Sequence, residues 1–242
     1  MALKYRRVTQ VGVPRVPAAS QSENHVAVFA IVAEGQVEEP MYLNYVFRMC
    51  RRKFQTNMQI HIVNEELAEI GENEHSSQPK ARLRSLMIWL ERYNPDFMLY
   101  KDDSAWLVCD RDDGGFSIKQ LRTVASDCEK NKIHFILSNP AFQLWLLFHF
   151  TDIINIQLLN KKKFSKGKLK EIEKMLRNYD PKYTHGTIDM TQYDYLLETA
   201  ITNSQEYPTS IDSLKRHVGT NFAELLEYIK NVYNFQSFSQ II

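Results

Sequence analysis

Two patterns of hydrophobic and polar positions alternate along residues 25–150. Short, almost continuous apolar runs are typical of strands covered on both faces. They occupy residues 25–33, 58–63, 105–109 and 133–137. Between and after these runs, apolar residues recur every three or four positions, which predicts helices. These helices are expected over residues 41–54, 79–93, 116–131 and 141–150. The alternation predicts an α/β layered domain with a mostly parallel central sheet.

The two ends of the chain show other patterns. Residues 161–242 have helical spacing, which predicts helices over 168–178, 191–204, 211–218 and 221–234. We therefore expect residues 151–242 to form a helical C-terminal region packed on the core. Residues 1–24 contain Pro14, Pro17 and a polar run at 20–24. We interpret them as an extended arm. The expected organisation is therefore an arm (1–24), a layered core (25–150) and a helical region (151–242).

Composition narrows the class of protein but does not identify a ligand. Of the 242 residues, 44% are hydrophobic, which is enough to form a core without disulfides. The 30 Lys and Arg nearly balance the 29 Asp and Glu, so any nucleic-acid surface must be local. Three widely spaced cysteines without a C-x-x-C pair argue against a zinc ribbon or a disulfide framework. The cysteine pattern fits a protein of the reducing cytoplasm. No apolar run approaches roughly 18 residues, so we expect no membrane span.

Acidic residues follow two of the predicted strands. Asp110 and Asp112 come directly after the run 105–109. In an extended chain, alternate residues point to the same side, so both carboxylates can share one cation. Gly114-Gly115 follow and allow a substrate backbone to approach closely. Such oxygen ligands suit Mg²⁺ or Mn²⁺. The alternative is an ordinary polar turn, because Asp and Gly are common turn formers.

Glu34-Gly35 ends the first predicted strand. In parallel sheets, ligands bind beyond the carboxyl ends of the strands, where Glu34 would meet the Asp pair. An acid there also suits the N-terminus of the next helix, so Glu34 is informative only together with the other acids. We therefore predict a metal site that contains Glu34, Asp110 and Asp112. Glu39 and Asp113 are weaker candidates for support around it.

The order and context of Glu34-Gly35 and Asp110-Arg111-Asp112 resemble the metal site of the Toprim fold of primases, topoisomerases and nucleases. A closer resemblance is to the RloB family. Residues 33–42 resemble its first motif, residues 138–150 (SNPAFQLWLLFHF) resemble a long second motif, and residues 207–210 resemble a late Pro-Thr element. The resemblance spans roughly residues 25–217. The chain departs from the family pattern at Glu38, where Thr is usual, and at Gln143, where Glu is usual.

This resemblance implies a Toprim-type nuclease that depends on Mg²⁺ or Mn²⁺ and acts in prokaryotic antiviral defence by abortive infection. An ATPase of the ABC or AAA type, encoded nearby, would control it. Glu34, Asp110 and Asp112 would be catalytic, and Gln143 would alter the activity if the family Glu is catalytic. The alternative is a non-catalytic subunit that binds the ATPase or nucleic acid. The sequence leaves open whether the substrate is DNA, RNA or tRNA, what triggers the protein, and whether it is a homo-oligomer.

Other polar residues permit two interpretations each. Asn139 is either a helix N-cap or a phosphate contact. His149 is either a core histidine or a residue that reaches the site. A basic run is either a phosphate-binding segment or a solvated loop; it contains Lys161, Lys162, Lys163, Lys166 and Lys168.

Overall fold

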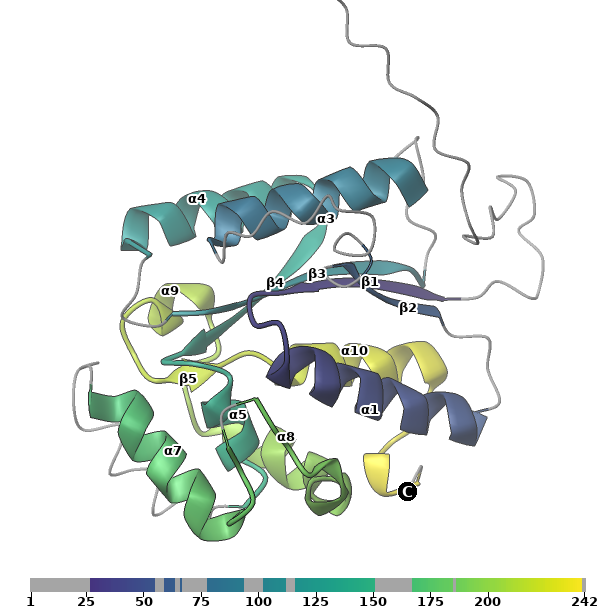
Figure 1. Ribbon diagram of the computed structural model, residues 1–242. Coiled ribbons are helices and arrows are strands. Elements are labelled where there is room, and N and C mark those ends of the chain that lie inside the picture. The colour runs from purple at the N-terminus through teal and green to yellow at the C-terminus, as the bar shows by residue number, and fades with distance from the viewer. Residues whose placement is uncertain are drawn as a thin grey trace, which may run out of the picture.

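The fold is a five-stranded sheet between two layers of helices (Figure 1). The computed structural model describes residues 27–54, 59–63, 66, 78–93, 102–111, 116–150, 167–184 and 186–240. The arm expected over residues 1–24 lies outside this part of the chain. The strands are β1 (Val28–Ala33), β2 (Gln59–Ile62), β3 (Ser104–Asp110), β4 (Ile133–Asn139) and β5 (Gly219–Thr220), in the order β2-β1-β3-β4-β5. The first four are parallel and β5 is antiparallel to β4, which confirms the predicted mostly parallel α/β sheet.

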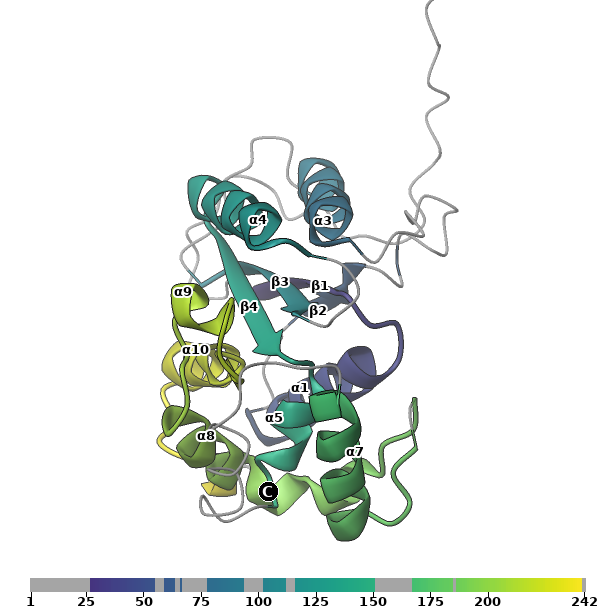
Figure 2. The ribbon, with the colours of Figure 1, turned by 90° about the vertical axis from the view of Figure 1, so that its left-hand side faces the viewer.

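Helices cover both faces of the sheet, as two views at right angles show (Figures 1 and 2). One face carries α3 (Pro79–Tyr93) and α4 (Ile118–Lys130). The other face carries α1 (Glu38–Phe54), α5 (Gln143–Leu147), α7 (Gly167–Tyr179), α8 (Leu197–Gln205) and α10 (Ala223–Tyr233). The short α9 (Ile211–Leu214) lies against β4. Short 3₁₀ turns complete the chain at η1 (Met190–Gln192), η2 (Asp194–Leu196) and η3 (Phe238–Gln240).

The apolar run of β1 is explained by burial on both faces. Phe29, Ile31 and Ala33 join the cluster under α1 and α5. The alternate positions Val28, Ala30 and Val32 join the cluster under α3 and α4. Successive side chains of a strand point to opposite faces, so a central strand with two helical layers has to be apolar at every position.

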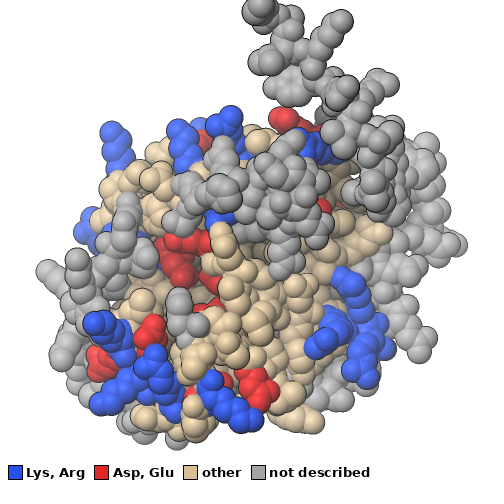
Figure 3. Space-filling model, viewed as in Figure 1, with Lys and Arg blue, Asp and Glu red and all other residues tan. Residues whose placement is uncertain are grey.

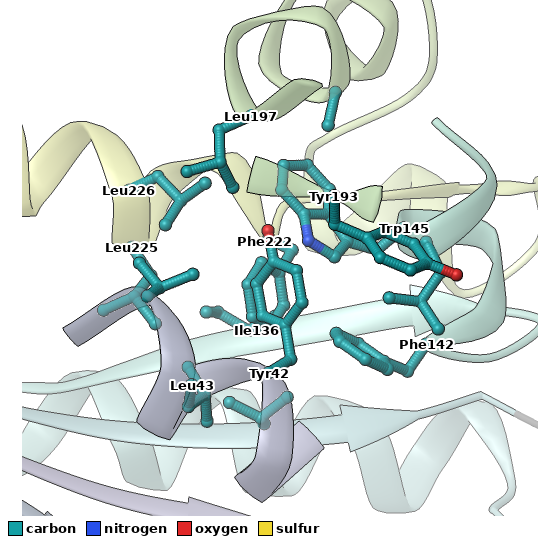
Figure 4. Close-up of a cluster of buried hydrophobic side chains, with 14 of the residues drawn as sticks. Tyr42, Leu43, Ile136, Phe142, Trp145, Tyr193, Leu197, Phe222, Leu225 and Leu226 are labelled. Atoms are coloured by element: carbon teal, nitrogen blue, oxygen red, sulfur yellow. The ribbon is translucent and has the colours of Figure 1, made fainter. Parts of the chain in front are cut away.

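Aromatic side chains connect α1, α5 and α10 on one face of the sheet (Figure 4). The Trp145 ring lies 5.0 Å from the Phe222 ring and 6.4 Å from the Tyr42 ring, and all three are buried. Each such pair contributes about 0.5–1.5 kcal/mol beyond the burial of its area. The same cluster includes Ile172 of α7 and Leu197 of α8, so helices after residue 150 share one hydrophobic core with the elements before it.

The C-terminal region is mostly helical, as expected, but the prediction of helix throughout was wrong in places. The segment predicted as helix from 211 to 218 is helical only over the four residues of α9, and the strand β5 follows it. The segment predicted from 191 starts as two 3₁₀ turns before α8 begins at Leu197. Periodicity missed β5 because a two-residue strand is shorter than any repeat.

Asn221 extends the pairing of β5 along the β4 edge. Its Oδ1 accepts a bond of 2.8 Å from the Leu137 N–H, and its Nδ2 donates one of 2.9 Å to the Phe135 carbonyl. The side-chain amide thus replaces the next residue of a neighbouring strand. Among the described residues, no helix is long and apolar enough to cross a membrane.

Candidate active site

Two of the predicted acids meet at the carboxyl edge of the sheet. β1 and β3 are parallel neighbours, with Ala33 opposite Val108. The Glu34 N–H continues this pairing by donating to the Val108 carbonyl at 2.9 Å. The Asp110 N–H then donates to Glu34 Oε2, also at 2.9 Å. This bond fixes the Glu34 carboxylate beside the backbone of Asp110. Asp112 and Asp113 lie outside the described residues.

Gly35 gives Glu39 the room to fold back over the strand end. The Gly35 N–H donates to Glu39 Oε1 at 3.3 Å. A Cβ on Gly35 would stand 2.0 Å from Glu39 Oε2, so a side chain there would displace the carboxylate. Glu39 is only 4% exposed. The structure therefore places Glu39, a weaker candidate from the sequence, next to the backbone that follows Glu34, and this position requires glycine at residue 35.

A buried arginine, not foreseen from the sequence, lies under the acids. Arg82 of α3 is 1% exposed, and its Nη2 donates to the Glu34 carbonyl at 3.3 Å. Burial lowers the pKa of its guanidinium, and the negative charges of Glu34 and Glu39 oppose that effect. Its sequence position was a usable signal, because Arg82 falls on the apolar stripe of α3 with Leu86 and Leu90. A charged residue on such a stripe needs a buried partner.

The resulting group of charges suits a divalent cation. Glu34 and Asp110 are half-buried, and Figure 3 shows acidic side chains in red near the point where β1 ends in Figure 1. Within the described ranges no three side chains form a complete metal-binding group. Two carboxylates are nevertheless a usual protein contribution to a Mg²⁺ site, which keeps waters and substrate phosphates as its other ligands. The hard oxygen donors present fit Mg²⁺ or Mn²⁺.

Asn139 and His149 have structural contacts. Asn139 is fully buried and its Nδ2 donates to the Leu214 carbonyl at 2.7 Å. The N-cap of α5 is Phe142, so the interpretation of Asn139 as an N-cap was wrong. The His149 Nδ1 lies 3.1 Å from the Trp145 carbonyl and its Nε2 lies 3.1 Å from the Tyr42 hydroxyl. Burial lowers the pKa of His149 to about 4, so it is a neutral core histidine.

The two positions that depart from the RloB pattern are bonded to each other. Gln143 Nε2 donates to Glu38 Oε2 at 2.5 Å. The Tyr183 hydroxyl and the Gly186 N–H donate to the other oxygen, Glu38 Oε1, at 3.0 and 2.8 Å. Glu38 and Gln143 are each 5% exposed. In this chain α1 supplies the carboxylate of the cluster and α5 supplies an amide that donates to it.

The predicted basic run is described only at its end. Lys161, Lys162, Lys163 and Lys166 lie outside the described residues, and Lys168 lies in the first turn of α7. The interpretation as a phosphate-binding segment remains a prediction.

Comparison with protein families decides the assignment of the chain. The family model described as RloB-like protein matches residues 29–229. The chain belongs to the RloB-like family. No curated protein and no solved structure matches it. The matched segment runs from β1 into α10, so in this RloB-like chain the C-terminal helices and β5 belong to the family unit together with the sheet.

Proposed function

We propose that this RloB-like protein is a Mg²⁺- or Mn²⁺-dependent nuclease of the Toprim type. The observation that carries the proposal is the bond between the Asp110 N–H and the Glu34 carboxylate at the ends of two adjacent parallel strands. This edge is where open α/β sheets bind ligands. Both acids are half-buried at this edge, and Gln36 and Val37 beside Glu34 are exposed, so a phosphodiester can approach them from solvent.

Glu34 and Asp110 would hold the cation, with Asp112 as the third acid. When bound, the ion would offset charge on the phosphate and lower the pKa of a water molecule. The protein positions its own groups beforehand. The 2.9 Å bond from Asp110 orients the Glu34 carboxylate as a ligand or as a general base. Arg82 reduces the repulsion between Glu34 and Glu39 in the absence of substrate.

The same arginine supports a second candidate function. Because Arg82 supplies a positive charge to Glu34 and Glu39, the acidic group is partly compensated without a cation. The protein would then be a regulatory subunit that binds an ATPase or nucleic acid without cleaving it. Calorimetric titration with Mn²⁺ separates the two functions, because only the nuclease requires binding that Asp110→Asn removes.

The decisive experiment is a cleavage assay with purified protein. Single- and double-stranded DNA, RNA and tRNA are incubated with Mg²⁺, Mn²⁺, Ca²⁺ or EDTA. We expect cleavage with Mg²⁺ or Mn²⁺ only, and its loss in Asp110→Ala and Asp112→Ala. Asp127→Ala, which removes an acid of α4 that is paired with the exposed Lys130, is the matched control. Cleavage that persists in both site variants would show that the activity belongs elsewhere.

The resemblance to defence proteins further suggests control by an ATPase partner in abortive infection. The test is to add the ATPase encoded nearby, with and without ATP, to the cleavage assay. We expect the ATPase to change the cleavage rate of the intact protein. An ATPase that neither binds the protein nor changes its rate would contradict this part of the proposal.

A further inference from the structure

The exposed face of α1 forms a groove that the site described above does not use. Met41, Tyr45 and Arg48 succeed one another at helical spacing on this face, and Arg51 follows one turn later. Together with Met190 and Thr191 of η1, they line a groove of about 600 Å³. The fold brings η1 here because the aromatic core holds Tyr193 against His149, with ring centroids 5.2 Å apart.

The chemistry of the groove combines positive charge with exposed apolar and aromatic surface. Among the described residues, its lining contains Arg48 and Arg51 but no acidic residue. The Arg48 guanidinium lies over the Tyr45 ring at 5.2 Å from the centroid. Met41 is 38% exposed and Val37, one turn earlier, is 45% exposed. Large apolar side chains that remain exposed beside arginines are typical of a surface that binds a partly apolar anion.

The groove leads toward the acids at the strand ends. The loop from Glu34 to Val37 runs directly into α1, and Arg48 follows ten residues after Glu38. At 1.5 Å per residue, this separation is about 15 Å along the helix axis. Figure 3 shows the sequence of surfaces from red acids, across an uncharged tan area, to blue basic side chains. A stacked strand that rises about 3.4 Å per nucleotide would cover this distance with about four nucleotides.

We infer that this groove binds a single-stranded segment of nucleic acid and directs it to Glu34 and Asp110. Arg48 and Arg51 contact phosphates, while unpaired bases pack on Tyr45 and Met41. Aromatic platforms in a basic groove are the usual means of binding single strands, since every base has a face that can stack. In a duplex the bases face one another, and Tyr45 and Met41 would have no base to contact. The inference rests on the proposed nuclease only for the destination of the strand.

The test measures binding separately from cleavage. Fluorescent oligonucleotides, single-stranded dT and rU and a matched duplex, are titrated with the Asp110→Ala protein in EDTA. Arg48→Ala and Arg51→Ala should each weaken single-strand binding about tenfold. Each should also reduce the slope of log K against log salt by about 0.7 for one lost phosphate contact. Tyr45→Leu should weaken binding about tenfold without changing this slope, whereas Tyr45→Phe should bind like the parent.

Lys119→Ala removes an exposed cation from α4, on the opposite face of the sheet, and should have no effect. Thermal melting of each variant identifies any loss of binding that is due to unfolding, and if Tyr45→Leu does not fold, Arg48→Ala and Arg51→Ala carry the test. Groove variants that bind and cleave like their parents would overturn the inference and leave the nuclease intact. Binding lost in these variants, in a protein that cleaves nothing, would support the groove and overturn the nuclease. A protein that binds no oligonucleotide, but forms dimers that Arg48→Ala disrupts, would assign the groove to a second copy of the chain.

Discussion

Glu34 and Glu38 lie four residues apart, yet their carboxylates belong to two different regions of the molecule. Glu38 is buried, and three donors from α5 and from residues 183–186 bind its two oxygens. Glu34 is half-buried at the sheet edge, where the Asp110 N–H and the Arg82 guanidinium bond to it. A carboxylate surrounded by the protein's own donors holds elements together, whereas one at an accessible edge beside a second acid suits an external ligand.

The largest effect should come from removing the charge of each glutamate in turn. Glu34→Gln should lower the cleavage rate about 10³-fold, because a ligand of the cation is lost, with little change in melting temperature. Glu38→Gln should instead lower the free energy of unfolding by about 1–3 kcal/mol, since charge-assisted bonds become weaker. Its cleavage rate per folded molecule should stay near that of the parent. Cleavage kinetics and chemical denaturation measure the two quantities, and equal effects of both variants on the rate would contradict the comparison.

Exchanging the partner of Glu38 should reduce stability more than Glu38→Gln does. Gln143→Glu places a second carboxylate at the position that now donates to Glu38, which should cost about 3–5 kcal/mol at neutral pH. The loss of stability should be small near pH 4, where the introduced carboxyl group is protonated, and should grow as the pH rises toward 7, where it ionises beside Glu38.

The compensating double variant is the control for this exchange. Glu38→Thr with Gln143→Glu returns one hydroxyl and one carboxylate to the cluster. It should recover most of the stability that Gln143→Glu loses, as measured by urea denaturation. A double variant whose loss equals the sum of the two single losses would show that the positions are not coupled.

The buried His149 should make the stability of the protein sensitive to acid. Its pKa is about 4 in the folded state because of burial, against 6.5 in an accessible site. The rings of Tyr42 and Tyr193 that face it stay neutral, since burial raises the pKa of both. The neutral imidazole therefore contributes about 3 kcal/mol to the free energy of unfolding above pH 6.5. This contribution is lost as the pH falls toward 4. Denaturation of the parent and of His149→Gln between pH 7 and 4 should show a smaller decline in the variant.

The smallest effect concerns the cation alone. Mn²⁺ at ten times its Kd should raise the free energy of unfolding by about 1.4 kcal/mol. Asp110→Asn should abolish this gain, whereas Glu38→Gln should keep it. Thermal denaturation with and without Mn²⁺ measures the difference. If Glu38→Gln removed the stabilisation by Mn²⁺ and Asp110→Asn kept it, the cation would bind at Glu38 and not at Glu34 and Asp110.

Elements with long or uniform patterns could be predicted from the sequence. The runs of β1 and β3 were recognisable because both faces are buried, and α3 was predicted with its observed bounds. The meeting of Glu34 and Asp110 followed from one rule about parallel strand ends. Features that depend on contacts distant in sequence were not accessible. The Glu38–Gln143 bond joins residues 105 positions apart, and each residue alone looked like a departure from the family pattern.

Two other errors have the same origin. Asn139 precedes a proline and a helix, which is a typical N-cap position, but its amide is directed to the Leu214 carbonyl, 75 residues away. Arg82 was hidden in a helix whose periodicity was correct, because a pattern of spacing reports which face is buried and not what lies opposite it. The proximity of Glu34 and Asp110 could therefore be predicted, whereas the position of Arg82 beneath them could not.

The side chain of Asn221 has a consequence for how these molecules behave when concentrated. A strand at the edge of a sheet presents unpaired backbone N–H and C=O groups, with which a strand of another chain can pair, and such pairing commonly starts aggregation. Here β5 covers Ser138 and Asn139, and the Asn221 amide covers the groups of Leu137 and Phe135. One asparagine thus protects a stretch of border that two residues of strand are too short to cover. The protein gains resistance to edge-to-edge association without adding a further strand.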